Sequence, residues 1–378
     1  MLKLALTLML ISGAEEPPVP VSRADQVRQM RETKALNLEE PTRPFLEKAL
    51  YEFKERRVLE QFQRGWYGFR PLLGGMPTGA GFAAGTAYER GGLRASAQAS
   101  LNGYRKYEGS FSIPNLPTER LAADVRITHR DFPEERFFGI GRQSDTRDRS
   151  TYHLRDTAYE GRLSYRLTDH ATAGVLGGWL ASDVEASWTT VETPAYLQSG
   201  AFLEVDYRDE PENPRAGGHY ALDWTSFQDR GLRQHGFGRY QVEVRQYFPF
   251  FNQRRVIAVR ARTVLTQTAP KQDVPFHMMP ALGGADDLRG FDEFRFRDRN
   301  MVVLNAEYRW EAFSGLDMAL FVDAGQVAAR ARDFNLNNFK TAAGFGFRFN
   351  TAKSVFLRAD IGFSEEGARL FLKFSRAF

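Results

Sequence analysis

Apolar and polar residues alternate with a period of two over most of the chain, from Trp66 to the end. Residues 203–208 read Leu-Glu-Val-Asp-Tyr-Arg, and residues 240–245 read Tyr-Gln-Val-Glu-Val-Arg. Successive side chains of a β-strand point to opposite faces, so each segment has one apolar and one charged face. The alternation predicts strands, but it does not separate a soluble sandwich from a membrane barrel, because both show it.

Segments with this pattern recur sixteen times. They lie at 66–74, 80–89, 92–103, 104–114, 119–132, 151–167, 169–183, 197–209, 217–229, 237–249, 254–268, 300–312, 316–326, 339–349, 354–364 and 369–378. Even-numbered connections are short turns, such as 252–253, whereas several odd-numbered ones are long and polar, including 136–150, 183–196 and 269–299. Outer-membrane barrels sort their connections in this way, with turns on the periplasmic side and loops outside. The sequence therefore predicts an all-β fold, a 16-stranded antiparallel transmembrane β-barrel over residues 66–378.

The N-terminal part differs in composition from the strands. A short apolar run after Lys3 predicts a secretory signal peptide over residues 1–14. Residues 15–65 are charged and interrupted by prolines, which indicates a periplasmic tail rather than a domain. Apolar residues at helical spacing from Pro44 to Phe62 predict one amphipathic helix in this tail. Three roles stay open for that helix: it plugs the barrel, lies on the membrane or tethers the chain.

Composition excludes a helical membrane protein. Hydrophobic residues make up 42% of the chain and the mean hydropathy is −0.45, and no run of about 18 apolar residues follows the N-terminal segment. The 31 phenylalanines fit the aromatic girdles of a barrel. The absence of cysteine removes disulfides and a lipoprotein anchor. The net charge of +4 is small and its charges are interspersed, so we expect no nucleic-acid partner.

Counting by two along the strands that follow the longest loop assigns their inner faces. Glu307 and Asp323 fall on the inner faces of adjacent strands. Gly325 shares the inner face with Asp323, and Gly344 and Gly346 lie inward on the next strand, leaving room for a loop to approach. An arginine that reaches back from the loop would find two carboxylates there and form charge-assisted, bidentate bonds.

Four motifs carry a resemblance to a known family. The motif of the longest loop consists of Leu288, Arg289, Gly290 and Phe291. It resembles the (V/I)RG(F/Y) signature in the sixth extracellular loop of the BamA/TamA-type bacterial surface-antigen superfamily. Phe-Val-Asp-Ala-Gly at 321–325 is similar to the FxDxG strand motif of that family, and Asn-Ala-Glu at 305–307 to its Glu-bearing strand. The segment 208–218 is similar to its RDNPxxP…G turn.

The resemblance implies specific roles for these residues. It implies that Arg289 packs against Glu307 and Asp323 inside the barrel, where the contact chiefly stabilises barrel and loop. Phe374 and Phe378 resemble the C-terminal signal by which barrel proteins are themselves assembled, although Arg376 departs from that pattern. Periplasmic POTRA domains need more residues than the N-terminal tail offers, so we expect a member lacking POTRA domains.

The sequence offers no catalytic or metal-binding constellation. Histidines stand at 129, 153, 170, 219, 235 and 277 without paired metal-ligand spacing. A GxSxG elbow is absent, and Gly139-Ile-Gly141 lacks the third glycine of a nucleotide loop. We therefore expect no enzyme, no metal and no cofactor.

Three functions remain open from the sequence. The first is assistance to outer-membrane protein or lipid assembly through a weak seam between the first and last strands, where Gly74, Gly75 and Pro77 interrupt the first strand. The second is a passive pore or transporter, with selectivity set by four lumen charges. These charges are Arg309, Asp323, Arg348 and Arg358. The third is a structural surface antigen.

The expected location and partners follow from the barrel and from the resemblance. We expect a place in the cell outer membrane, in contact with its lipids and lipopolysaccharide. Unfolded outer-membrane proteins or lipids are the expected clients of the first function. The chain itself is expected to be a client of the barrel-assembly machinery.

Overall fold

A computed structural model describes Met30 and residues 66–351 and 354–374 of the chain. The chain divides into two units, Met1–Lys48 and Ala49–Phe378, and the fold described below belongs to the second. The predicted signal peptide, the tail with its helix and Phe378 lie outside the described residues, so these predictions stand as made.

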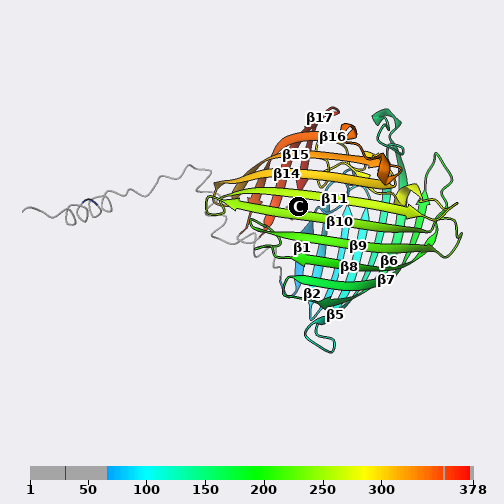
Figure 1. Cartoon of the computed structure of the whole chain (residues 1–378), viewed down its shortest axis with the longest axis horizontal. Helices are drawn as coiled ribbons and strands as arrows, with labels where there is room; N and C mark the ends of the chain where they lie inside the picture. The colour runs from blue at the N-terminus through cyan, green and yellow to red at the C-terminus, as the bar shows by residue number, and fades with distance from the viewer. Residues whose placement is uncertain (1–29, 31–65, 352–353, 375–378) are drawn as a thin grey trace, which may run out of the picture. The chain divides into compact units, whose positions relative to one another are not determined.

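Sixteen antiparallel strands form one sheet (Figure 1). They are β1 (Phe69–Leu73), β2 (Ala83–Arg90), β3 (Leu93–Ser100), β4 (Arg105–Ile113), β5 (Leu121–Phe137), β6 (Ser150–Arg166), β7 (Ala171–Glu185), β8 (Ala195–Asp206), β9 (Gly217–Asp229), β10 (Phe237–Phe250), β11 (Arg255–Thr268), β14 (Asn300–Phe313), β15 (Leu316–Ala328), β16 (Lys340–Asn350), β17 (Val355–Ser364) and β18 (Gly367–Lys373). The predicted strand number and order are confirmed.

The remaining elements lie in the connections between these strands. Two further short strands, β12 (Ala281–Leu282) and β13 (Phe296–Arg297), form a small separate sheet. Single 3₁₀ turns occur at η1 (Thr146–Asp148), η2 (Phe276–Met278), η3 (Ala331–Asp333) and η4 (Leu336–Asn338). Across the described ranges, no helix combines the length and the apolar character that a membrane crossing requires.

The sorting of the connections is less strict than the sequence suggested. Long odd-numbered connections occur at 138–149, 186–194 and 269–299, as expected. However, the odd-numbered connection 365–366 is a two-residue turn, and the even-numbered one at 207–216 is long. In the long turn, Asp209 accepts hydrogen bonds from the backbone N–H groups of residues 210 and 215, at 2.9 and 3.0 Å, so side-chain capping holds an extended connection together.

The two faces of the sheet have opposite character. On β14, Leu304 is 45% exposed, whereas its neighbours Asn305 and Val303 are 4% and 0% exposed. On β15, Val322 is 56% exposed and Asp323 is fully buried. The exposed outward residues are therefore apolar, while the inward face carries buried polar residues together with apolar ones such as Val303, a pattern that suits a membrane barrel with a packed interior.

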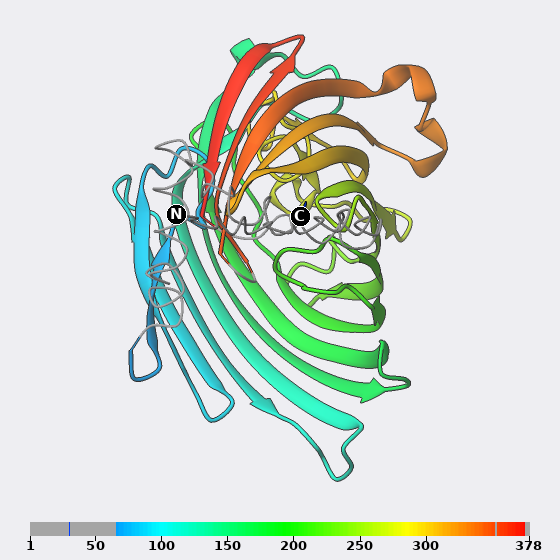
Figure 2. The same cartoon turned by 90° about the vertical axis from the view of Figure 1, so that its left-hand side faces the viewer.

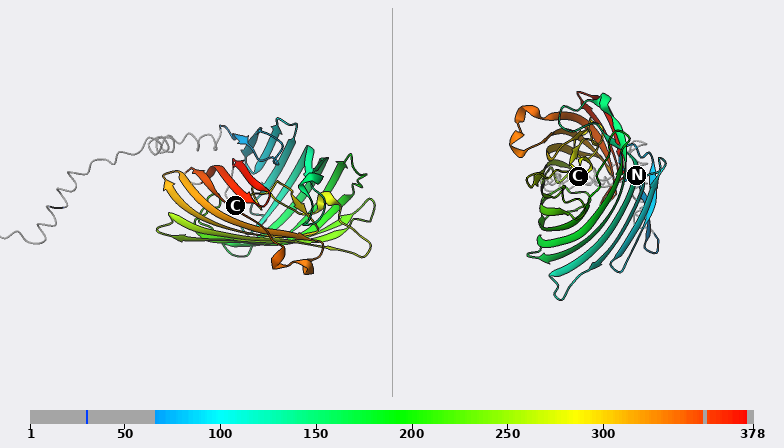
Figure 3. Two further views of the ribbon diagram at one scale, coloured as in Figure 1. Left: turned by 90° about the horizontal axis from the view of Figure 1, so that it is seen from above. Right: turned by 90° about the vertical axis from the view of Figure 1, so that its right-hand side faces the viewer.

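The sheet curls around the long loop but does not close. Figure 2 shows the first strands, in blue, and the last, in red, at the two edges of the curled sheet, with the yellow loop segment inside the curve, and Figure 3 gives two further views. Hydrogen-bonded neighbours run from β1 to β18 without a pairing between these two strands in the described residues. The strands approach at one point, where an added Cβ on Gly74 would lie 3.9 Å from the Cβ of Phe374.

The loop 269–299, called loop 6 below, packs into the curve of the sheet. Its β12–β13 hairpin is short, because only two residues of each strand pair. Loop residues and wall residues share one apolar cluster. Its members are Val264, Leu282, Leu288, Phe291, Phe296, Met301, Val303, Val327 and Ala342. Each is buried, so the loop contributes to the core of the fold as well as filling space.

Candidate functional site

The motif of loop 6 is buried, and each of its residues has its own environment. Leu288 and Phe291 are fully buried in the apolar cluster, and Phe291 stacks edge-on against Phe296 with ring centroids 5.3 Å apart. Gly290 has a φ of +114°, and its carbonyl accepts a hydrogen bond from the Ser364 hydroxyl at 2.7 Å. A positive φ and close walls favour glycine here.

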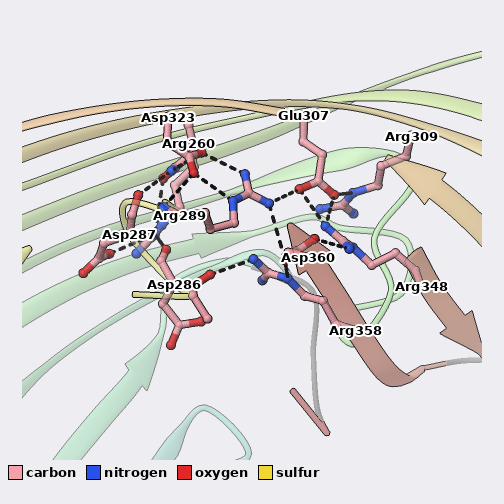
Figure 4. Close-up of polar contacts among 12 residues, drawn as sticks. Arg260, Asp286, Asp287, Arg289, Glu307, Arg309, Asp323, Arg348, Arg358 and Asp360 are labelled. Carbon is pink, nitrogen blue, oxygen red and sulfur yellow. Dashed lines mark hydrogen bonds and ion pairs between the residues drawn. The ribbon is translucent and has the colours of Figure 1, made fainter. Parts of the chain in front are cut away.

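Arg289 lies between two carboxylates of the barrel wall (Figure 4). Its Nε and Nη2 donate to Oδ2 and Oδ1 of Asp323, both at 2.8 Å, and its backbone N–H donates to Asp323 at 3.1 Å. Its Nη1 donates to Glu307 Oε2 at 2.7 Å. The side chain of Arg289 is 1% exposed and those of the two carboxylates are fully buried. This forked geometry uses what arginine has and lysine lacks.

The guanidinium of Arg289 also lies over an aromatic ring. Its central carbon is 3.5 Å from the ring centroid of Phe321 on β15, a cation–π contact in a water-poor setting. Gly344 makes room for that ring, because an added Cβ would lie 2.5 Å from the tip of Phe321. The guanidinium of Arg289 therefore contacts the Phe321 ring with one face and the carboxylates of Asp323 and Glu307 with its edges.

A second group of charges surrounds Glu307. Arg309 donates to its Oε1 at 2.7 Å, and Arg348 Nη2 donates to both of its oxygens at 2.9 and 3.0 Å. Arg348 also binds Asp360 on β17 at 2.6 Å. Arg358 pairs with the same Asp360 and donates to the backbone carbonyl of Ala285 in loop 6 at 2.7 Å. Strands β14 to β17 are therefore tied to one another and to the loop (Figure 4).

A third contact joins the other side of loop 6 to β11. Arg260 donates to the carbonyl of Asp286 at 2.6 Å and to the carboxylate of Asp287 at 3.2 Å. Asn305 donates to the Asp287 carbonyl at 2.7 Å and to Asp323 at 2.8 Å. These bonds give the loop fixed points on both sides of Arg289.

The electrostatics of loop 6 keep Arg289 charged and bonded to the barrel wall. Burial would lower the pKa of Arg289, but its bonds to Asp323 and Glu307 hold the pKa above its ordinary value, so the guanidinium stays protonated. Burial raises the pKa of Asp287, and Arg260 opposes that rise. The carboxylates around Arg289 are engaged by guanidinium groups, which makes the set suited to holding a loop rather than to proton transfer.

The structure also shows what each predicted glycine does. Leu282 of the loop hairpin approaches Gly325, where an added Cβ would lie 3.0 Å from it. Gly346 leaves space for the pair of Asp360 and Arg348, since an added Cβ would be 2.0 Å from the carboxylate. The glycine that admits the loop backbone is Gly362, where an added Cβ would be 2.6 Å from the carbonyl carbon of Arg289. The atoms nearest to Gly344 and Gly346 belong to the wall, namely Ile361 and Phe321 at the first and Asp360 and Arg348 at the second, and the room for the loop predicted at these two glycines stays a prediction.

Sequence reasoning missed Asp360 and Gly362, although a signal was present. Residues 360–362 repeat the Asp-x-Gly spacing of residues 323–325 on a second strand. In both cases the aspartate and the glycine share the inner face of their strand. The aspartate accepts hydrogen bonds from arginines, and the glycine leaves space for a residue of loop 6 to come close to the wall. Phe374 follows β18 and lies beside Gly74, and its ring meets that of Phe356 edge-on with the centroids 5.9 Å apart.

One group of residues has metal-ligand geometry. Ligand atoms of Glu204, Asp206 and His219 lie within 4.8 Å of one another. However, Arg208 donates to both oxygens of Asp206, at 2.8 and 2.6 Å, and His219 bonds Glu204 at 2.8 Å. A guanidinium already provides the positive charge at this place, so we assign no metal to it.

Replacing Arg289 by Ala is expected to weaken the folded barrel. Asp323 would stay buried without its bidentate partner, which costs about 3–5 kcal/mol for a buried pair. We expect a smaller heat-modifiable folded fraction on semi-native gels and a lower urea midpoint. Arg289→Lys keeps the charge but loses the fork, so it should fall between the two. Arg332→Ala, at an exposed loop position, is the control. Unchanged folding of Arg289→Ala would contradict the view that Arg289 stabilises the barrel and loop 6.

Gly362→Ala is expected to displace loop 6 while sparing most of the sheet. The new methyl would clash with the backbone of Arg289, and overpacking of this kind costs about 1–3 kcal/mol. Limited proteolysis should cut residues 269–299 faster than in the native chain. Gly109→Ala is the matched control, because an added Cβ there meets nothing within 4 Å. Equal cleavage of the two variants would show that the loop does not depend on this contact.

Comparisons with known proteins agree with this geometry. A family model described as the Omp85 superfamily domain matches residues 90–369. Among solved structures, the chain is similar to BamA from Haemophilus ducreyi lacking POTRA domains 1–3, with a TM-score of 0.61 and 13% identity, covering 86% of this chain and 78% of that one. No curated protein matches the chain.

The chain is also similar to two CdiB structures. With CdiB from Acinetobacter baumannii the TM-score is 0.53 and the identity 14%, over 77% of this chain; with CdiB from Escherichia coli they are 0.55 and 13%, over 83%. The chain spans 55% and 63% of those two proteins. Identities this low show a shared fold, whereas the family model covers most of this sequence. The chain belongs to the Omp85 superfamily.

Proposed function

We propose that this barrel lies in the cell outer membrane and assists the assembly of outer-membrane proteins or lipids through a lateral seam. An outward apolar wall and an inward polar wall suit a bilayer setting. The expected contacts are the lipids and lipopolysaccharide of that membrane, and the expected clients are unfolded barrel proteins or lipids.

The observation that carries the proposal is the open end of the sheet. β1 and β18 have no ladder between them in the described residues, although fifteen other pairings follow one another around the sheet. An unpaired strand edge is a template on which another extended chain can add. A seam at this place gives a client access to both the lumen and the bilayer.

The buried ion pairs around Arg289 favour the gap between β1 and β18 as the place where the sheet opens. Glu307, Asp323, Arg348 and Asp360 tie β14, β15, β16 and β17 to one another or to loop 6. Opening the barrel between any of these strands would break buried ion pairs, at about 3–5 kcal/mol for each partner left unpaired. Parting β1 from β18 breaks none of these pairs.

The lumen charges give little support to the alternative of a passive pore. Arg309, Asp323, Arg348 and Arg358 are each at most 3% exposed. Arg309 and Arg348 bind wall carboxylates, whereas Asp323 and Arg358 bind loop 6. Charges that set the selectivity of a pore face water and passing solutes. In this barrel the four side chains instead bind wall carboxylates and loop 6, and so hold the wall strands and the loop together.

A disulfide across the seam tests the assembly function. Gly74→Cys with Phe374→Cys suits a disulfide, because the Cβ separation of 3.9 Å falls in the range of real bridges. The native chain has no cysteine, so the pair reacts only with itself. We expect proteoliposomes with the native barrel to accelerate folding of a urea-unfolded eight-stranded barrel protein, and oxidation of the pair to abolish that acceleration.

The control for this experiment is a disulfide elsewhere in the same sheet. Ala95→Cys and Gly109→Cys face each other on β3 and β4. Oxidation of this pair should leave the acceleration unchanged, and reduction of the seam pair should restore it. Full acceleration with the seam disulfide formed would contradict the proposal that clients pass through the seam, and it would leave a structural role for the barrel.

Planar-bilayer recording tests the pore. We expect no steady open channel from the native barrel, because loop 6 and its ion pairs fill the lumen near Arg289. Gly362→Ala, which displaces the loop, should raise the conductance. A large and stable conductance of the native chain would contradict this prediction and favour transport.

A further inference from the structure

The outer surface of the sheet changes character at the ends of β5, β6 and β7 that lead into the connections 138–149 and 186–194. Further from these connections, the outward side chains are apolar and exposed. They include Val125, Ile127, Tyr159 and Val175. Nearer to the connections, the outward positions carry charges: Asp131 bonds His153 at 2.6 Å, and Arg155 lies 3.3 Å from Asp183. The outward face therefore becomes polar towards the connections.

The inward face of the same strand ends is apolar. One buried cluster lies there, and Phe276 of loop 6 packs against it. Its members are Ala80, Tyr104, Phe132, Phe137, Tyr152, Leu154 and Val184. An apolar inner face with a charged outer face is the polarity of a sheet in water. The connections 138–149 and 186–194 therefore lie beyond the apolar band, on the side that the proposed outer-membrane location exposes at the cell surface.

A cavity of about 540 Å³ lies between these two connections. Phe137 and Trp188 line it, and their rings are stacked in parallel, with an interplanar angle of 2° and centroids 4.9 Å apart. Trp188 is nevertheless 41% exposed. The polar residues of the lining are Gln143, Ser144, Asp148 and Ser150. A volume of this size, with aromatic walls and a few polar groups, is typical of a small-molecule site.

The connection 138–149 is held in place by loop 6. Arg295 donates to the Ser144 hydroxyl at 2.8 Å and to the Ser144 carbonyl at 2.6 Å. The Gly141 N–H donates to the carbonyl of Arg297 at 2.7 Å. A ligand in the cavity would therefore meet a surface that needs little further ordering, which lowers the entropic cost of binding.

Two polar side chains of the lining are available to a ligand. Among the described residues, the Gln143 amide and the Asp148 carboxylate form no hydrogen bond or ion pair, and both side chains are exposed. The neighbouring Arg147 is already bonded to Asp145, with Nη2 2.6 Å from Oδ2. The cavity thus combines a hydrogen-bond acceptor, a group that both donates and accepts, and an aromatic wall.

A sugar ring matches these groups better than an acyl chain or a cation does. A pyranose has a face of C–H groups that stacks on an aromatic ring, and a rim of hydroxyls that both donate and accept hydrogen bonds. An acyl chain would cover the Asp148 carboxylate without bonding it, which is costly. A cationic ligand would meet the connection 138–149, in which arginines outnumber aspartates.

We propose that this cavity is a saccharide-binding site, in which a sugar ring stacks on Trp188 while its hydroxyls bond Gln143 and Asp148. The proposal takes the outer-membrane location from the function proposed above and does not depend on the assembly activity. Two sources supply such a ligand: the glycan of lipopolysaccharide in the same membrane, and a soluble oligosaccharide. The chemistry that the cavity recognises is the same in both.

Calorimetric titration of the full chain in nanodiscs of synthetic phosphatidylcholine tests the site. The probe is the core oligosaccharide released from lipopolysaccharide by mild acid. We expect saturable binding by the native chain, with a similar affinity at low and at high ionic strength, because stacking and hydrogen bonds to hydroxyls are little screened by salt. Asp148→Asn keeps one acceptor oxygen, so it should retain binding.

Two variants with matched controls locate the binding. Trp188→Ala removes the stacking surface and should weaken binding at least about tenfold. Trp224→Ala is its control, since Trp224 has a similar exposure, 39%, but faces outward on β9. Gln143→Ala should weaken binding about fivefold, the effect of one hydrogen bond. Asn337→Ala, an exposed amide in another connection, is the control for that variant.

A second set of nanodiscs distinguishes the two sources. These nanodiscs contain lipopolysaccharide, and the same oligosaccharide is added to them. If the membrane glycan fills the cavity, the added oligosaccharide should no longer bind to the native chain. Unchanged binding would assign the site to a soluble saccharide, and either result supports the site.

The outcomes separate this proposal from the assembly function. Absence of saturable binding, or equal binding by the native chain and Trp188→Ala, would overturn the saccharide site. Binding that disappears at high salt and in Asp148→Asn would show a cationic ligand, which also overturns it. Should Trp188→Ala fail to fold, Gln143→Ala decides, because its side chain has no partner in the described part of the chain. Saccharide binding without acceleration of barrel folding would count against the assembly function alone.

Discussion

The structure depends on one buried cation, the guanidinium of Arg289. Moving a charged group out of water costs several kcal/mol, and a close pair offsets this only with good geometry and saturated hydrogen bonds. Asp323 and Glu307 meet that condition from two strands, and the ring of Phe321 covers a third side. Because the loop carries this cation, moving the loop out of the barrel would part the guanidinium from Asp323 and Glu307 and leave both carboxylates buried without it, so the loop and the wall stabilise each other.

The buried charges around Arg289 join some strands of the barrel to loop 6 and leave other strands outside this network. The partners of Arg289 and their neighbours lie on β14 to β17, and Arg260 adds β11. Strands β1 to β4 contribute a backbone N–H from the loop that follows β1, at Thr78, and no member of the buried charge network described above. The sheet therefore ends in a stiff strand on one side and a short, loosely held one on the other. That asymmetry is the physical basis of the seam proposed above.

Period-two counting was enough to predict the strands and the inward position of Glu307 and Asp323, because alternation depends on local chain geometry alone. The role of Gly362 could not be reached in this way, since it depends on how β16 and β17 pair and on the path of the loop across them. The β12–β13 hairpin was missed for a different reason: two residues are too few to show a period. Asp360 carried a signal in its Asp-x-Gly spacing, but only the structure shows that Arg289, Arg348 and Arg358 converge on it.

The open edges raise a problem that the rest of the fold does not. Backbone N–H and carbonyl groups left unpaired in hydrocarbon cost several kcal/mol each, which is why membrane barrels normally close. β1 reduces that cost by being short, by bonding Phe69 to its own turn and by carrying Pro71 where a donor would be exposed. β18 has none of these devices and keeps three consecutive edge positions complete. The unpaired edges are thus the feature of the fold on which the proposed lateral seam rests.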